Sequence, residues 1–159
     1  MFPILAPRSR AACSLAVAAA LISASAASAS HLRVTDETTR TECGACHMAY
    51  APQFLPARSW KQIMATLDNH FGEDASLDPD VAAKIEAYLT SHAADTGGNL
   101  PAALSGVSPS ETPLRISEMP WFTRRHAYEV SRRWLQKAGS WSNCTYCHRG
   151  AEQGYFEDD

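Results

Sequence analysis

The chain has 159 residues, of which 45% are hydrophobic and 19% are charged, and its 14 basic against 17 acidic side chains give a net charge of −3. This length fits one or two small domains and excludes a large multidomain enzyme. The acidic balance argues against a nucleic-acid partner, which would require a basic stripe. We therefore expect a small protein that does not act on DNA or RNA.

Residues 1–29 are predicted to be a leader and not part of the fold. Two arginines precede an apolar stretch over residues 11–22, and small residues then lead to the sequence Ala27-Ser28-Ala29. This order is typical of a cleaved secretory signal peptide, and the apolar stretch is shorter than the roughly 20 residues of a membrane-spanning helix. We expect an exported protein without stable membrane insertion, whose mature part retains four cysteines.

Two amphipathic helices are predicted in the first half of the mature chain. The first has an apolar stripe that leads to His70 and a stop at Gly72, with the stripe made of Trp60, Ile63, Met64 and Leu67. The second begins with Asp78 as N-cap and Pro79 at the first helical position. Its apolar face consists of Val81, Ile85, Tyr88, Leu89 and His92.

A segment rich in glycine, proline and serine, residues 98–114, is predicted to link a first unit, residues 30–97, to a second unit, residues 115–159. In the second unit a helical spacing ends before Gly139 and comprises Ala127, Val130, Trp134 and Ala138. No segment shows the sustained alternation of a strand. The predicted fold class is therefore mainly α.

Two C-x-x-C-H motifs carry the chemistry of the chain. Their cysteines are Cys43 and Cys46 in the first and Cys144 and Cys147 in the second, and their histidines are His47 and His148. This motif is the attachment sequence of c-type haem, in which both thiols form thioethers and the following imidazole is the proximal iron ligand. Two such motifs predict two covalently attached haem c groups, each of which supplies the core that a small unit lacks.

Other uses of paired cysteines fit less well. Zinc ribbons usually separate their pairs by about 15–20 residues, whereas here about a hundred residues intervene. Thioredoxin-like chemistry needs one active pair in a strand-rich fold. Simple disulfides leave unexplained why a histidine follows both pairs. The dihaem interpretation is therefore favoured.

The distal ligand of each iron has one leading candidate and one alternative. For the first haem we favour His70, which ends an apolar stripe, over His92, which lies at the end of the next helix. For the second haem we favour His126 over Met119. If both histidines bind, both irons are six-coordinate with two imidazoles, a state that favours low-potential electron transfer and leaves no open site for oxygen or peroxide.

With these residues the chain resembles the dihaem cytochrome c family of small exported bacterial proteins, often called DHC. The resemblance rests on Cys43–His47, the Trp60–Ala75 segment, Ile85–Leu89, Met119–His126 and Cys144–His148. It implies a class I cytochrome c-like N-terminal haem domain, a less regular helical C-terminal haem domain, and two histidine ligands on each iron. It thereby supports His70 and His126.

The resemblance also implies a function. Members of the family carry electrons, as periplasmic proteins, from a membrane-bound cytochrome to a soluble c-type haem protein, and we expect this chain to do so as a monomer and not as an enzyme. The alternative is a small dihaem enzyme or gas sensor with one five-coordinate haem, as in dihaem peroxidases, which need a displaceable ligand and a distal acid–base group. Those enzymes are much longer than this chain.

Charge is distributed unevenly between the two units. The first unit and the C-terminal Glu157-Asp158-Asp159 are acidic and could steer a basic partner. The second unit has a basic cluster made of Arg124, Arg125, Arg132 and Arg133. The cluster has three interpretations at this stage, which are pairing with haem propionates, docking of an acidic partner, and a solvated helix face.

Overall fold

The computed structural model describes residues 32–96 and 102–156, so the predicted leader lies outside the described residues. The helices are α1 (Glu37–Cys43), α2 (Ala57–Met64), α3 (Pro79–Ser91), α4 (Pro120–His126) and α5 (Arg132–Ala138). Short 3-10 turns connect them, and the described residues contain no strand, only an isolated bridge between His70 and Glu73. This confirms the mainly α fold class. None of the described helices is long and apolar enough to cross a membrane.

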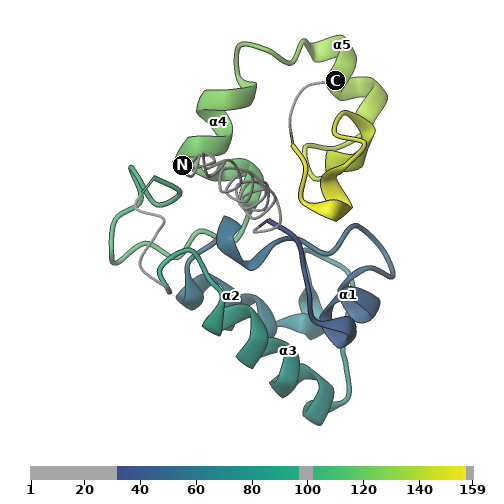
Figure 1. The fold of residues 1–159 in the computed structure, drawn as a ribbon, viewed down its shortest axis with the longest axis vertical. Coiled ribbons are helices and arrows are strands. Elements are labelled where there is room, and N and C mark those ends of the chain that lie inside the picture. The colour runs from purple at the N-terminus through teal and green to yellow at the C-terminus, as the bar shows by residue number, and fades with distance from the viewer. Residues whose placement is uncertain (1–31, 97–101, 157–159) are drawn as a thin grey trace, which may run out of the picture.

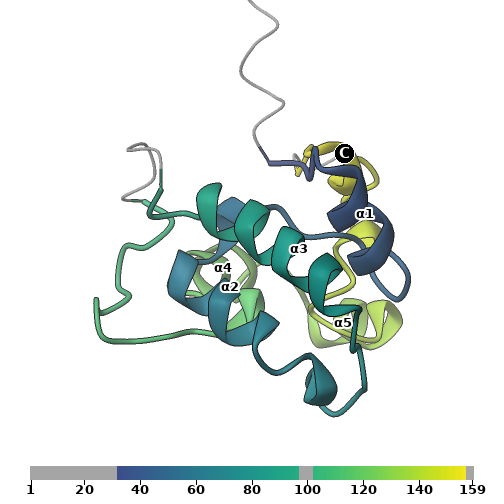
Figure 2. The same cartoon turned by 90° about the horizontal axis from the view of Figure 1, so that it is seen from below.

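The molecule has two tiers (Figure 1). Helices α1, α2 and α3 form the lower tier in this view, and α4, α5 and the C-terminal segment form the upper tier. Seen from below in Figure 2, α2 and α3 lie in front of α4, whereas α1 lies beside the C-terminal segment. Each tier contains one C-x-x-C-H motif, because the first begins at Cys43, the last residue of α1, and the second follows α5.

Side chains fix the starts of two helices in the lower tier. Asp36 is the N-cap of α1, where its carboxylate accepts a 2.7 Å hydrogen bond from the backbone N–H of Thr39. Asp78 is the N-cap of α3, where it accepts from the N–H of Asp80 at 2.9 Å, and Pro79 takes the first helical position. Such side chains satisfy backbone donors that have no partner inside the helix. The predicted start of α3 is therefore confirmed.

Helix α2 is shorter than its apolar stripe predicts. It ends at Met64, and a separate 3-10 turn, Leu67–Asn69, leads to His70. The helix stops because Thr66 leaves the helical conformation, with φ −131°, and its hydroxyl donates to the carbonyl of Gln62 at 3.1 Å. A threonine hydroxyl can satisfy a helix-end carbonyl in this way. The prediction of one helix up to His70 is wrong.

The upper tier also contains a break that the helical spacing does not predict. Residues 127–131 separate α4 from α5, so the predicted continuous helix over 127–138 is wrong. A new helix begins at Ser131, the N-cap of α5, whose side chain accepts a hydrogen bond from the N–H of Trp134 at 3.4 Å. Gly139, with φ 78°, ends α5 as predicted, because this conformation suits glycine.

Both tiers contribute to one hydrophobic core. Met119 is fully buried and Phe122 is 6% exposed, and both belong to the same cluster as the lower-tier residues. The lower-tier members are Leu55, Trp60, Ile63, Ile85, Leu89 and Ala93. Helix α4 is therefore anchored in the core of the N-terminal half.

The described part of the predicted linker packs on the same core through its apolar side chains Leu104, Val107 and Leu114. Arg58 also holds this segment, because its guanidinium donates to the carbonyls of Glu111 at 2.6 Å and Ser108 at 3.1 Å. The segment over residues 102–114 is thus attached to the lower tier. The division into units at 98–114 stays a prediction.

Candidate functional site

Each tier brings together two of the histidines that the sequence singles out. In the lower tier His47, which follows the first cysteine pair, faces His70, with ring centroids 6.2 Å apart and ring planes 19° apart. A metal–imidazole bond of roughly 2.0–2.1 Å, with about 1.2 Å more to each ring centre, places two rings on opposite sides of one metal about 6.4 Å apart. The two rings therefore fit the opposite faces of one haem iron.

A tight turn presents His70 to His47. Phe71 and Gly72 both have positive φ, 58° and 105°, and the backbone of His70 pairs with Glu73 through N–H···O distances of 2.7 and 3.2 Å. A bulky residue such as Phe71 rarely adopts this conformation, which is found mostly where the surrounding structure has a functional use for it. Gly72 meets the same requirement without strain.

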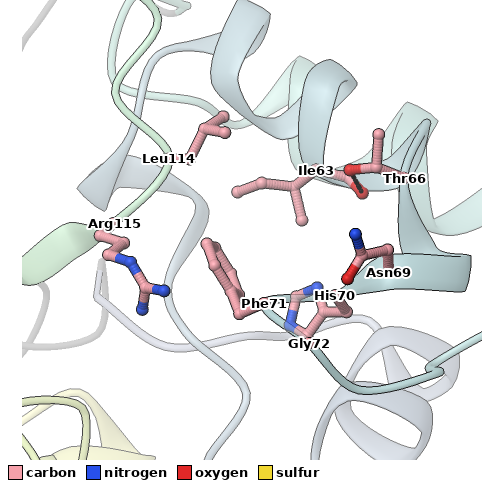
Figure 3. A pocket seen from close by; sticks show the side chains of 8 residues that line it. All are labelled: Ile63, Thr66, Asn69, His70, Phe71, Gly72, Leu114 and Arg115. Atoms are coloured by element: carbon pink, nitrogen blue, oxygen red, sulfur yellow. Dashed lines mark hydrogen bonds between the residues drawn. The ribbon is translucent and has the colours of Figure 1, made fainter.

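The side chains around His70 hold its ring and lower its basicity. The ring centroids of His70 and Phe71 are 4.8 Å apart, and the guanidinium of Arg115 lies 4.2 Å from the centroid of the Phe71 ring. These residues line a cavity of about 300 Å³ together with Ile63, Thr66, Asn69, Gly72 and Leu114 (Figure 3). Burial lowers the pKa of His70, and the nearby His47 and Arg115 lower it further. Its neutral imidazole, the form that binds metals, is thereby favoured.

Two contacts orient His47. Its Nδ1 lies 2.7 Å from the carbonyl oxygen of Met48, so Nδ1 carries the proton and donates it to that oxygen, leaving the Nε2 lone pair available. Tyr50 stacks on the ring, with centroids 4.7 Å and planes 17° apart. Together they fix the rotation of the imidazole.

The upper tier contains the second pair of histidines. His126 ends α4 and His148 follows the second cysteine pair, and their ring centroids are 6.1 Å apart with planes at 89°. This separation fits one iron as the first does, although the two rings are perpendicular. His126 stacks on Phe122 at 3.9 Å, and its Nδ1 donates to the carbonyl of Phe122 at 2.9 Å.

His148 differs from the other proximal histidine. Its Nδ1 is buried and has no hydrogen-bond partner within the described residues, whereas the Nδ1 of His47 has one. The ring of Phe156 lies 5.6 Å from that of His148 and 5.4 Å from that of Phe54 in the lower tier. His148 is therefore contacted by the apolar ring of Phe156, whereas His47 has a hydrogen bond to a backbone carbonyl.

The alternative ligands lie in other surroundings. Met119 is fully buried in the hydrophobic core. His92 is exposed at the end of α3, where its Nδ1 donates to the carbonyl of Tyr88 at 2.9 Å and its ring lies 4.6 Å from that of Tyr88. His92 is therefore bonded within its own helix, at the carbonyl end of α3.

The four thiols are unpaired in the structure. Burial raises the pKa of Cys43 to about 11, with a contribution from the charge of Glu42, and burial also raises the pKa of Cys144. Cys46 and Cys147 are exposed. No group of three or more Cys, His, Asp or Glu side chains among the described residues could hold a metal ion, in contrast to a zinc site. The donor set is suited to two thioethers and an axial imidazole at each motif.

One hydrogen bond joins the two sites directly. The hydroxyl of Tyr50, whose ring stacks on His47, donates to the carbonyl of Ser142 at 2.7 Å, two residues before Cys144. Neither Tyr50 nor Phe156 is singled out by the sequence patterns, because each acts through a partner remote in the chain. A tyrosine three residues after a C-x-x-C-H motif is the one local signal that could have found Tyr50.

Comparisons with known proteins agree with this chemistry. A sequence model of the family described as "Dihaem cytochrome c" matches residues 39–156, which include both motifs and both histidine pairs. The chain belongs to the dihaem cytochrome c family. It accordingly carries two covalently bound haem c groups, and family membership implies an electron-transfer haem protein.

Solved structures of other dihaem cytochromes are similar to this one. A diheme cytochrome c from Rhodobacter sphaeroides is 61% identical, with a TM-score of 0.77, over 79% of this chain and 99% of that one. The diheme cytochrome type c from Shewanella baltica OS155 is 43% identical, with a TM-score of 0.62, over 76% of this chain and 86% of that one. A comparison with curated proteins finds no match.

Proposed function

We propose that this dihaem cytochrome is an electron shuttle in which two imidazoles bind each iron, His47 and His70 in the lower tier and His126 and His148 in the upper tier. The proposal rests on one observation, the separation of 6.2 and 6.1 Å between the ring centroids of the two pairs. Cys43, Cys46, Cys144 and Cys147 are the proposed attachment points. When bound, each haem c supplies a one-electron ferric/ferrous couple.

One histidine of each pair is oriented by a hydrogen bond to the backbone. His47 and His126 each donate Nδ1–H to a backbone carbonyl, and such bonds fix the tautomer and the ring orientation of a metal-binding imidazole. Two imidazoles on one iron would favour the ferric state more than an imidazole and a thioether, so both potentials would be low. With two imidazoles on each iron, oxygen and peroxide would find no open coordination site.

Contacts between the tiers keep the two sites close. The hydrogen bond from Tyr50 to Ser142 and the edge-to-face contact of Phe54 with Phe156 cross from one tier to the other. The rate of electron transfer falls steeply with distance, so a fixed and short separation favours transfer within the molecule. The two haem sites would thereby act in series in electron transfer.

The proposed partners follow from the resemblance to the family. The protein would receive electrons as a monomer from a membrane-bound cytochrome and pass them to a soluble c-type haem protein in the periplasm. The signal peptide predicted for residues 1–29 supports this location and would leave a mature chain that begins near residue 30.

Binding of carbon monoxide to the ferrous holoprotein tests the coordination. Two imidazoles on each iron predict that the visible spectrum of the dithionite-reduced protein stays unchanged after addition of the gas. Myoglobin, in which one axial position is open, is the positive control. A rapid spectral change in half or more of the haem would refute the proposal and favour the five-coordinate enzyme or gas sensor.

A further inference from the structure

The two tiers carry opposite charge. Residues 32–96 contain 5 basic and 10 acidic side chains, whereas residues 120–156 contain 6 basic and 2 acidic ones. The ribbon separates these stretches into the lower and the upper tier (Figure 1). The described part of the molecule is therefore an electric dipole with one haem site at each pole.

The cations of the upper tier surround the second haem site. We call them the basic surface: Arg124, Arg125, Arg132, Arg133, Lys137 and Arg149. Two precede His126 directly and one follows His148. The other three lie on α5, which packs on the second attachment motif because Trp134 is 6.5 Å from Tyr146 and the amide of Asn143 donates to the carbonyl of Ala138 at 2.9 Å.

The cations of the basic surface are available for a partner. All six are exposed, and none forms an ion pair within the described residues. The three ion pairs that the described residues do form involve Arg40, Arg58 and Arg115. A haem has two propionates, so pairing with the second haem could neutralise only a minority of the six.

The first haem site has the opposite surroundings. Asp68, Glu73 and Asp74 lie within four residues of His70 and are all exposed, and Glu42 precedes Cys43, against one cation, Arg115, in the cavity beside His70. An acidic protein that approaches this site meets like charges, which repel it. Discrimination between the two poles therefore comes from repulsion as well as attraction.

We propose that the basic surface docks an acidic electron-transfer protein, so that this class of partner exchanges electrons at the second haem and is excluded from the first. The inference rests on the proposed electron-transfer function and adds to it the charge of one partner and the pole at which it docks. Long-range attraction would orient the partner before contact.

Binding between oxidised proteins tests the docking without any electron transfer. The probe is oxidised flavodoxin, a strongly acidic redox protein, titrated calorimetrically into the ferric holoprotein. We expect the dissociation constant to rise about tenfold or more between roughly 20 and 200 mM salt, because salt screens exposed charges. Amide chemical shifts should change on α4, on α5 and next to Arg149, not around His70.

Matched double variants assign the binding to one pole. Arg132→Gln with Arg133→Gln removes two cations of the basic surface and should weaken flavodoxin binding at low salt about fivefold. Lys61→Gln with Lys84→Gln removes two exposed cations of the lower tier and should change it less than twofold. Equal losses in the two double variants, or binding that ignores salt, would overturn the inference.

Two further outcomes would also overturn it. Phosphatidylglycerol vesicles that sediment the protein through the basic surface, without flavodoxin binding, would assign that surface to anionic lipid. Flavodoxin binding only after removal of Glu157–Asp159 would assign it to the acidic C-terminal residues of this chain. Reduction by the neutral semiquinone of lumiflavin tests electron transfer separately, because failure there rejects the proposed function, whereas failure with flavodoxin alone rejects only the docking.

Discussion

Replacing His70 by methionine should change the iron coordination of one haem and leave that of the other unchanged. On iron, the near-parallel rings of His47 and His70, at 19°, would act on the same d orbitals, whereas the perpendicular rings of His126 and His148, at 89°, would leave two of those orbitals nearly equal in energy. The ferric wild-type protein should therefore show two distinct low-spin signals in electron paramagnetic resonance. His70→Met should remove only the signal of the parallel pair.

The same substitution should raise one of the two potentials. A thioether favours ferrous iron more than an imidazole does, and axial ligands set haem potentials over a range of about 0.8 V. We expect a rise of about 0.1 V or more for one haem, which is about fiftyfold in its redox equilibrium at 59 mV for each factor of ten. The potential of the second haem should move far less, because its ligands come from the other tier.

A potentiometric titration followed in the visible region measures both potentials, and the near-infrared band of a methionine ligand identifies the new coordination. His92→Met is the matched control, because His92 is exposed at the end of α3 and bonded to Tyr88. The reasoning is refuted if His70→Met retains both signals and both potentials, or if the control removes one of them.

Three further predictions concern stability, measured by denaturant unfolding of the holoprotein. Asp36→Ala should lower the free energy of unfolding by about 1 kcal/mol and Asp36→Asn by much less, since asparagine also caps a helix; equal losses in both variants would contradict the capping role. Hydrogen bonds from Thr39 lower the pKa of Asp36, so the stability that Asp36 contributes is present above about pH 3.9 and is lost as the pH falls further. Tyr50→Phe should lower the free energy of unfolding by about 1 kcal/mol while the haem spectra stay unchanged, because the stacked ring remains and only the hydrogen bond to Ser142 is lost. An altered spectrum would show that the hydroxyl acts on the first haem. Ile85→Ala at a fully buried core position should cost about 2–5 kcal/mol against about 0.5–1.5 kcal/mol for Ile85→Val, and a loss below 1 kcal/mol for alanine would mean that this core contributes little beside the haems.

Local patterns in the sequence were sufficient for the features that depend on neighbouring residues. The C-x-x-C-H motifs, the cap at Asp78 and the stop at Gly139 each need only a few consecutive side chains, and all are visible in the printed chain. The family and its two haems follow from the motifs. The same kind of reasoning failed at Thr66 and Ser131, because an apolar spacing continues through residues whose hydroxyl groups end or restart a helix.

The geometry of the candidate site depends on contacts that no local pattern contains. The apolar spacing favours His70 as the distal ligand of the first haem. Its position opposite His47, however, depends on the positive φ of Phe71, which no sequence rule predicts for a bulky side chain. The bond from Tyr50 to Ser142 joins residues 92 positions apart. Contacts of this kind arise from packing of the tiers, so only the three-dimensional structure shows them.

The shared core bears on the order in which the protein can mature. Synthesis begins at the N-terminus, so the first attachment motif is complete long before Met119 and Phe122, two of the side chains that close the core around α2 and α3. Until they arrive, the lower tier lacks part of its apolar interior and stays open to the enzymes that attach haem. The first motif is therefore accessible while the core is incomplete, and the lower tier does not close as an independent module.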